Sequence, residues 1–181
     1  MVRRILFAFA LSVSLSSFAQ DRGKITSALS FAPGFLTENT YTIQVQGYLG
    51  YLKDRIELRG DGFYFIDSYG DRPRFSMNHQ LFAGAMYHFS DNAFQPYAGF
   101  QPGIAFAKSS EYGTLNNSSG EIDYNMAVSP IGSATFGFSF YGEKLFFLFM
   151  EGRYIFGKHK ANTYSIFLDE ARISFGLGLY L

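Results

Sequence analysis

Hydrophobic residues alternate with small or polar residues along most of this chain, and the pattern is clearest in the last stretch, 171–181. Every second position there is hydrophobic: Ala171, Ile173, Phe175, Leu177, Leu179 and Leu181. The positions between them are Arg172, Ser174, Gly176, Gly178 and Tyr180. Side chains of a strand point alternately to its two faces. A strand that crosses a bilayer needs about 9–11 such residues, so a membrane-spanning β-strand is predicted here.

Eight segments share this alternation and are predicted as strands: 24–35, 40–51, 55–67, 77–89, 94–107, 124–140, 145–156 and 171–181. The connections after the second, fourth and sixth segments are short. Those after the third, fifth and seventh are longer and polar, at 68–76, 108–121 and 157–164. Short periplasmic turns, longer external loops and an even strand number are typical of outer-membrane barrels. The predicted fold is therefore all-β: an eight-stranded, antiparallel, up-and-down transmembrane β-barrel with both termini periplasmic.

Alternation alone does not say which face of the strands points outward. A soluble barrel of the lipocalin kind would turn its hydrophobic face inward and carry a charged exterior. Here the second face is mostly Ser, Thr, Gly, Ala and Gln, and charged residues make up only 17% of the chain, against about 25% in soluble domains. This composition favours a hydrophobic face turned toward lipid. Pro102 and Pro130 fall inside predicted strands, where we expect bulges or a flared hairpin to accommodate them.

The first residues follow the plan of a secretory signal peptide. Arg3 and Arg4 precede the hydrophobic run 5–11, and Ser17-Phe18-Ala19 places small residues at a cleavage site. The run is shorter than the roughly 20 residues that a membrane-spanning helix needs. We expect a cleaved signal peptide at 1–19 and one barrel domain at 20–181; an uncleaved anchor is the alternative.

The charge balance argues against a nucleic-acid-binding protein, which would show a basic excess. The chain has 15 basic and 15 acidic residues. Removing 1–19 takes away two arginines and no acid, which leaves 13 against 15 and a net charge of −2. The chain has no cysteine, so it has no disulfide or thiolate metal site, and its 3 histidines lack the spacing of metal ligands. No cofactor or metal is expected.

Charged residues gather at inward-facing positions of three predicted strands. The third and seventh strands lie opposite each other in a ring of eight, and an eight-stranded interior is only wide enough to be filled by side chains. We therefore expect an ionic network across the lumen. Two interpretations remain open, a packed ionic plug that holds the barrel in shape and the gate of a narrow pore. The predicted network consists of Arg55, Glu57, Arg59, Asp61, Glu151, Arg153 and Arg172.

These features together resemble the small outer-membrane β-barrel family of the OmpA/OmpX type, over about 20–181. The resemblance rests on the signal peptide, the eight alternating segments, Pro96-Tyr97-Ala98-Gly99-Phe100 at the start of the fifth strand, and the Gly-rich closing strand. It implies that the barrel-assembly machinery reads the closing segment during biogenesis. The expected assembly signal is Phe175, Gly176, Leu177, Leu179, Tyr180 and Leu181, with Leu where the family more often ends in Phe.

The expected protein is an integral, monomeric component of the bacterial outer membrane in contact with its lipids. It has a structural or surface-interaction role without catalysis, and its external loops are candidate sites for an extracellular ligand. One alternative is a narrow passive pore. Another is a lipid A-modifying hydrolase, because some barrels of this size deacylate lipid A with a His and a Ser spaced like His88 and Ser90. This pair lies at the periplasmic end, however, and the sequence shows no obvious Glu beside it.

Overall fold

The computed structural model describes residues 23–36, 40–70, 75–111, 113–142, 145–160 and 164–181, and the predicted signal peptide lies outside them. No helix among these residues is long and hydrophobic enough to cross a membrane. The strands of the described chain are β1 (Gly23–Leu36), β2 (Thr40–Lys53), β3 (Ile56–Tyr69), β4 (Phe75–His88), β5 (Phe94–Ser109), β6 (Thr114–Leu115), β7 (Ile122–Asp123), β8 (Met126–Tyr141), β9 (Phe146–Lys160), β10 (Ser165–Phe167) and β11 (Glu170–Tyr180).

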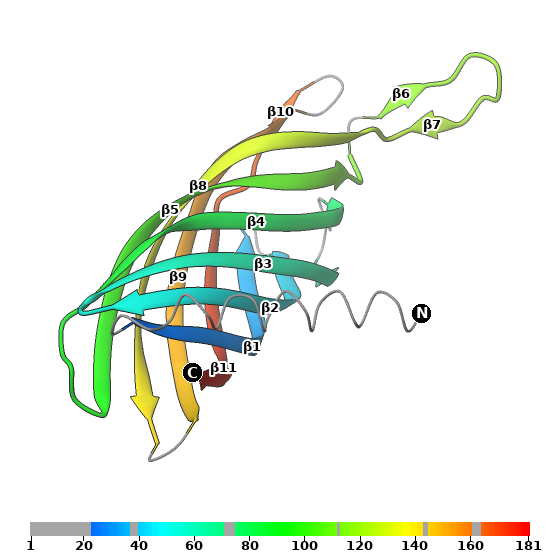
Figure 1. The fold of residues 1–181 in the computed structure, drawn as a ribbon. Helices are drawn as coiled ribbons and strands as arrows, with labels where there is room; N and C mark the ends of the chain where they lie inside the picture. Colours follow the sequence, from blue (N-terminus) through cyan, green and yellow to red (C-terminus); the bar gives the residue numbers. More distant parts are fainter. Residues whose placement is uncertain (1–22, 37–39, 71–74, 112, 143–144, 161–163) are drawn as a thin grey trace, which may run out of the picture.

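Eight of these strands close into one antiparallel barrel (Figure 1). Pairing runs from β1 through β5 to β8, β9 and β11, and β11 then pairs back with β1. Ile25 and Leu181 complete this last contact by exchanging two backbone hydrogen bonds of 2.9 Å. Closure gives every barrel strand a partner on both sides, as hydrocarbon surroundings require. The predicted eight-stranded antiparallel barrel is confirmed.

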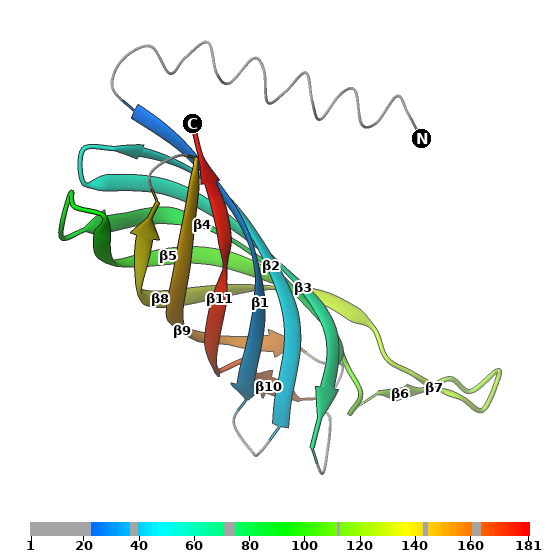
Figure 2. The same cartoon turned by 90° about the horizontal axis from the view of Figure 1, so that it is seen from below.

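The two ends of the barrel differ in their connections (Figure 1 and Figure 2). The β2–β3, β4–β5 and β8–β9 turns lie at one end, here called the turn end, together with the start of β1 and the end of β11. The β6–β7 hairpin projects from the opposite end, the loop end. This hairpin lies largely in the segment 108–121, which was predicted as a long polar connection.

The outer surface is a belt of exposed hydrophobic side chains contributed by all eight barrel strands. Residues between them face inward and are buried, for example Gln46, Gln101 and Ser174, each 0% exposed. This is the reverse of a soluble barrel, and it is the arrangement expected of a lipid-facing wall. Members of the belt that are at least half exposed include Leu29, Leu49, Leu58, Leu81, Phe100, Phe136, Leu148 and Leu177.

The wall loses some of its pairing toward the loop end. The β3–β4 ladder stops at Phe63 and Gln80, although both strands continue beyond that rung. The β8–β9 ladder reaches only Ile131 and Gly157, and β9 then continues to Lys160 by pairing with β10. The prediction that 157–164 is entirely loop is therefore wrong.

The two strand prolines cause no bulge. Pro102 faces Gly132 and Pro130 faces Ile104 in one continuous β5–β8 register. Pro130 directly precedes Ile131, the first β8 residue paired with β9, so its missing N–H breaks no rung of that ladder. Of the two expected alternatives, a bulge is absent at both prolines. Instead, β8 is unpaired with β9 from Met126 to Pro130, and the β4–β5 ladder lacks the two rungs between Phe82–Gly103 and Ala85–Phe100, where Pro102 lies.

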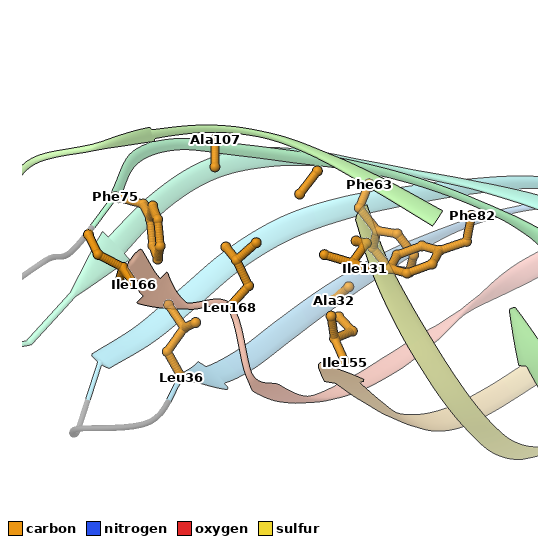
Figure 3. Close-up of a cluster of buried hydrophobic side chains, with 11 residues drawn as sticks. Ala32, Leu36, Phe63, Phe75, Phe82, Ala107, Ile131, Ile155, Ile166 and Leu168 are labelled. Carbon is orange, nitrogen blue, oxygen red and sulfur yellow. The ribbon is translucent and has the colours of Figure 1, made fainter. Parts of the chain in front are cut away.

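Inside the barrel, a cluster of hydrophobic side chains lies in the loop-end half, as Figure 3 shows. The interior there is less polar than expected, although buried Gln44, Asn78 and Glu170 lie beside the cluster. A second, aromatic cluster of Tyr48, Phe147 and Phe149 lies nearer the turn end. We call the first group the outer core: Ala32, Leu36, Phe63, Phe75, Phe82, Ala105, Ala107, Ile131, Ile155, Ile166 and Leu168.

Phe82→Ala should lower the free energy of unfolding by about 3–5 kcal/mol, the usual loss for a buried Phe. Phe82 is 3% exposed and packs edge-to-face on Phe63 with ring centroids 5.8 Å apart. Because the chain has no Trp, urea unfolding in lipid vesicles is followed by heat-sensitive gel mobility. Phe136→Ala, at a site 64% exposed to lipid, is the control and should lose much less. Equal losses would contradict an interior core.

Candidate functional site

Four charged side chains meet across the middle of the lumen. Arg59 and Asp61 lie two residues apart on β3, so both face inward; Glu151 and Arg153 do the same on the opposite strand, β9. Arg59 Nη2 lies 2.7 Å from Asp61 Oδ1 and 2.6 Å from Glu151 Oε2. Arg153 Nη2 lies 3.2 Å from Glu151 Oε1 and 3.3 Å from Asp61 Oδ2. We call these four residues the central cluster.

Neutral side chains from other strands complete the hydrogen bonding of the two carboxylates. Gln46 Nε2 donates to Asp61 at 2.7 Å and to Glu151 at 3.0 Å. The Tyr97 hydroxyl donates to Glu151 at 2.9 Å, and Gln101 Nε2 donates to Asp61 at 2.7 Å. Two positive and two negative groups thus form a neutral unit in which each carboxylate accepts from several donors, as buried ions require.

Aromatic rings cover the cluster on both sides along the barrel axis. Toward the turn end, the Arg59 guanidinium carbon lies 4.0 Å from the centroid of the Tyr48 ring. Toward the loop end, that of Arg153 lies 5.0 Å from the Phe63 ring and 5.1 Å from the Phe82 ring. All four charged side chains are at most 1% exposed, so the cluster is sealed from water on both sides.

Arg172 lies inside the barrel but pairs separately. Its Nη2 is 2.6 Å from Glu170 Oε2 and donates to Gln80 Oε1 at 3.2 Å, and Thr42 donates to Glu170. Glu170 was missed because the closing strand was predicted to begin at Ala171. Its position two residues before Arg172, on the same strand face, was the signal that identifies it.

Glu57 also faces inward, but it lies toward the turn end and outside the central cluster. Thr26 donates a hydrogen bond to it, and its Oε2 is 3.3 Å from His88 Nε2. The expectation that no Glu lies near His88 is therefore wrong. Residues far apart in sequence meet here because β3 and β4 pair, with Ile56 opposite Tyr87.

Arg55 is not a lumen residue, which corrects the prediction. It sits in the β2–β3 turn, where Asp54 has a positive φ of 55° and β3 begins only at Ile56. Its guanidinium is 3.1 Å from Asp91 Oδ2, with the two side chains 48% and 64% exposed. Hydrogen bonds to the Asp91 carboxylate raise the pKa of Arg55. The turn, and not the strand period, decides where this side chain points.

The structure does not bring His88 and Ser90 together as a catalytic pair. His88 is buried beside Glu57 and Tyr97, with its ring centroid 5.3 Å from that of Tyr97. Ser90 lies in the following turn, where its hydroxyl accepts from the Asn92 N–H at 3.2 Å. In the part of the chain that the structure describes, no group of three or more His, Cys, Asp or Glu side chains is placed to hold a metal ion.

The expected assembly signal forms the second half of β11 and the final residue. Phe175, Leu177 and Leu179 face outward and are 44–52% exposed. Gly176 pairs with Ser30 and Phe149, and Tyr180 donates to the Gly142 carbonyl at 3.1 Å. Recognition of these residues by the assembly machinery stays a prediction.

Glu151→Gln should lower the free energy of unfolding by about 3–5 kcal/mol, because it leaves Arg59 and Arg153 with one carboxylate between them in a dry interior. Adding Arg59→Met removes one charge of each sign, so the double variant should lose less than the sum of the two single losses. Asp91→Asn, which breaks the exposed pair with Arg55, is the control and should lose about 0–1 kcal/mol. Urea unfolding in vesicles measures all of them. If the loss of unfolding free energy in the double variant equalled the sum of the losses in Glu151→Gln and Arg59→Met, the two residues would not interact and the central cluster would be contradicted.

Comparisons with known proteins support the fold. No protein-family model and no curated protein matches the chain. Among solved structures, neisserial surface protein A matches with a TM-score of 0.64 and 16% identity, over 88% of this chain and 97% of that chain. The N-terminal β-barrel domain of Pseudomonas aeruginosa OprF matches at 0.54 and 15%, over 88% and 98%. Ail of Yersinia pestis matches at 0.50 and 11%, over 88% and 97%. The chain has the fold of the small outer-membrane β-barrels.

Proposed function

We propose that this protein is an integral component of the bacterial outer membrane with a barrel that its own side chains close to solutes. Its role is structural or surface-interacting, without catalysis. The observation that carries the proposal is the central cluster, buried between two hydrophobic layers. The barrel fold and its hydrophobic belt support the membrane location.

The layered interior argues against the narrow pore. An ion that passed through would have to cross the outer core, where Phe63, Phe82 and Ile155 are 0–3% exposed. It would then have to displace an arginine from two carboxylates. Breaking a buried pair of this kind costs about 3–5 kcal/mol.

A closed barrel leaves the loop end as the part that is free to meet partners. The β6–β7 hairpin extends beyond the barrel wall (Figure 1), and its cross-strand pair Leu115 and Ile122 is 61% and 54% exposed. Hydrophobic side chains presented on a projecting hairpin suit contact with another surface, and loops on a rigid scaffold often carry recognition. An extracellular ligand at this hairpin, outer-membrane lipids at the belt and the assembly machinery during biogenesis are the proposed partners.

Refolded protein in planar bilayers should show no steady conductance steps, because side chains fill the lumen. Single-channel recording at high salt tests this, with heat-unfolded protein as the control for non-specific leakage. Arg59→Ala, checked for folding by heat-sensitive gel mobility, tests the position of the block. Steady steps in the native protein that Arg59→Ala enlarges or abolishes would overturn the closed barrel in favour of a gated pore.

A further inference from the structure

The outer wall carries a hydrophobic groove of about 690 Å³ across β1, β2, β8, β9 and β11, on the lipid-facing side. Its floor is made of small outward-facing residues, Ala134, Gly152 and Ala171. An ideal Cβ on Gly152 would contact only the Phe136 carbonyl, at 3.9 Å. The backbone is therefore uncovered at this point, while most neighbouring outward positions hold large side chains.

Aromatic side chains form the walls of this groove. Phe35 and Tyr41 pack edge-to-face on one side, with ring centroids 5.2 Å apart. Phe156, the next outward residue after Tyr154 on β9, points away from the groove. Its ring stacks on Phe100 with centroids 6.0 Å apart and covers Gly132. That stacking turns Phe156 toward β5 and β8, which keeps the groove open.

The same face of β9 becomes basic immediately above the groove. Outward positions run from Phe146 to Phe156 without a charge, and Lys158 and Lys160 follow on the same face, both exposed. Ten residues of strand at about 3.3 Å each and a tilt of about 40° span roughly 25 Å of membrane thickness, the usual height of the hydrophobic band. The two ammonium groups therefore lie at the level of the lipid headgroups on the loop-end side.

Among the described residues, neither lysine is held in an ion pair; the Asp169 carboxylate accepts a hydrogen bond from the N–H of Gly157, the residue before Lys158, at 3.1 Å. Their cross-strand partners on β10 are uncharged: Lys158 faces Phe167 and Lys160 faces Ser165. The Lys158 ammonium lies 4.7 Å from the centroid of the Phe167 ring, which places it over the lipid-facing surface. From Lys158 down to Tyr154 at the groove is about 13 Å of strand, a length that the upper part of an acyl chain covers.

We propose that this face binds one phosphate-bearing lipid of the outer leaflet, with its phosphate on Lys158 and Lys160 and an acyl chain in the groove over Gly152. The inference rests on the proposed transmembrane placement, because only a lipid-facing groove is offered acyl chains. A free phosphate ion would use the lysines and leave the groove unused. A second copy of the chain would use the groove and leave the lysines unused. Of these three ligands, only the lipid uses both the lysines and the groove, because its phosphate lies at the headgroup level and its acyl chain extends toward the middle of the membrane.

The test is native mass spectrometry of the refolded full chain in neutral detergent, titrated with phosphatidic acid. The native protein should retain one phosphatidic acid saturably, and should not retain diacylglycerol with the same acyl chains. Lys158→Gln with Lys160→Gln should weaken retention about fivefold per lysine. Gly152→Leu fills the groove and should weaken it several-fold with both lysines intact. Inorganic phosphate at equal concentration should not displace the lipid.

Two matched variants control for general effects. Lys53→Gln removes an exposed charge at the turn end, and Gly60→Leu adds the same side chain to a lipid-facing glycine of β3, where a Cβ meets only backbone oxygens at 3.9–4.0 Å. Both should bind as the native protein does. Heat-sensitive gel mobility shows separately that each variant is a folded barrel, so loss of the barrel itself is distinguished from loss of the site.

The remaining outcomes would overturn the proposal. Equal retention of diacylglycerol would show that the lysines do not bind the phosphate. Displacement by inorganic phosphate would show that the acyl chain adds no affinity. Unchanged binding in Gly152→Leu would show that the groove takes no acyl chain, and dimers lost in that variant with lipid binding intact would assign the groove to a second copy.

Discussion

The pairing of β11 with β1 is the contact on which the rest of the structure depends. Inside a bilayer no water is available to satisfy a free strand edge, so the sheet must close on itself. Closure with eight strands leaves an interior just wide enough for side chains to fill. The backbone exchange between Ile25 and Leu181 thus closes the sheet that faces lipid and encloses the space that the buried side chains occupy.

The interior of the barrel is filled in two ways, by paired charges and by hydrophobic side chains. At mid-height, charged groups from opposite strands neutralise one another, and the two carboxylates accept further hydrogen bonds from Gln46, Gln101 and Tyr97. Toward the loop end the space is filled by the outer core. Because the charged layer lies between aromatic rings, water and salt screen the attraction within its ion pairs only weakly. It is a strong constraint on register, since a one-residue slip of β3 or β9 would place these charges in lipid.

The exterior follows a different rule, because lipid chains are fluid and fill most irregularities. Large side chains form the belt on every strand, yet over Gly152 and Ala171 the belt is interrupted. The stacking of Phe156 on Phe100 maintains that interruption from the neighbouring strands. The same strand then presents Lys158 and Lys160 at its loop end. The two faces of β9 therefore differ in role. Glu151 and Arg153 form ion pairs across the lumen, and the alternate residues face the membrane.

Local periodicity by itself determined the eight barrel strands and which side chains share a face, because a pleated strand forces alternate residues to opposite faces whatever their partners are. The composition of the two faces then indicated which one is turned toward lipid. It also placed Arg59, Asp61, Glu151 and Arg153 in the lumen. Only the tertiary structure decided which of the inward charges meet. Glu170 joins Arg172, Glu57 joins His88, and Arg55 leaves the barrel, because strand stagger and turn geometry act over residues far apart in sequence. The sequence pattern also did not predict the outer core, since residues such as Phe63, Phe82 and Ile155 come into contact only when the eight strands close into a barrel.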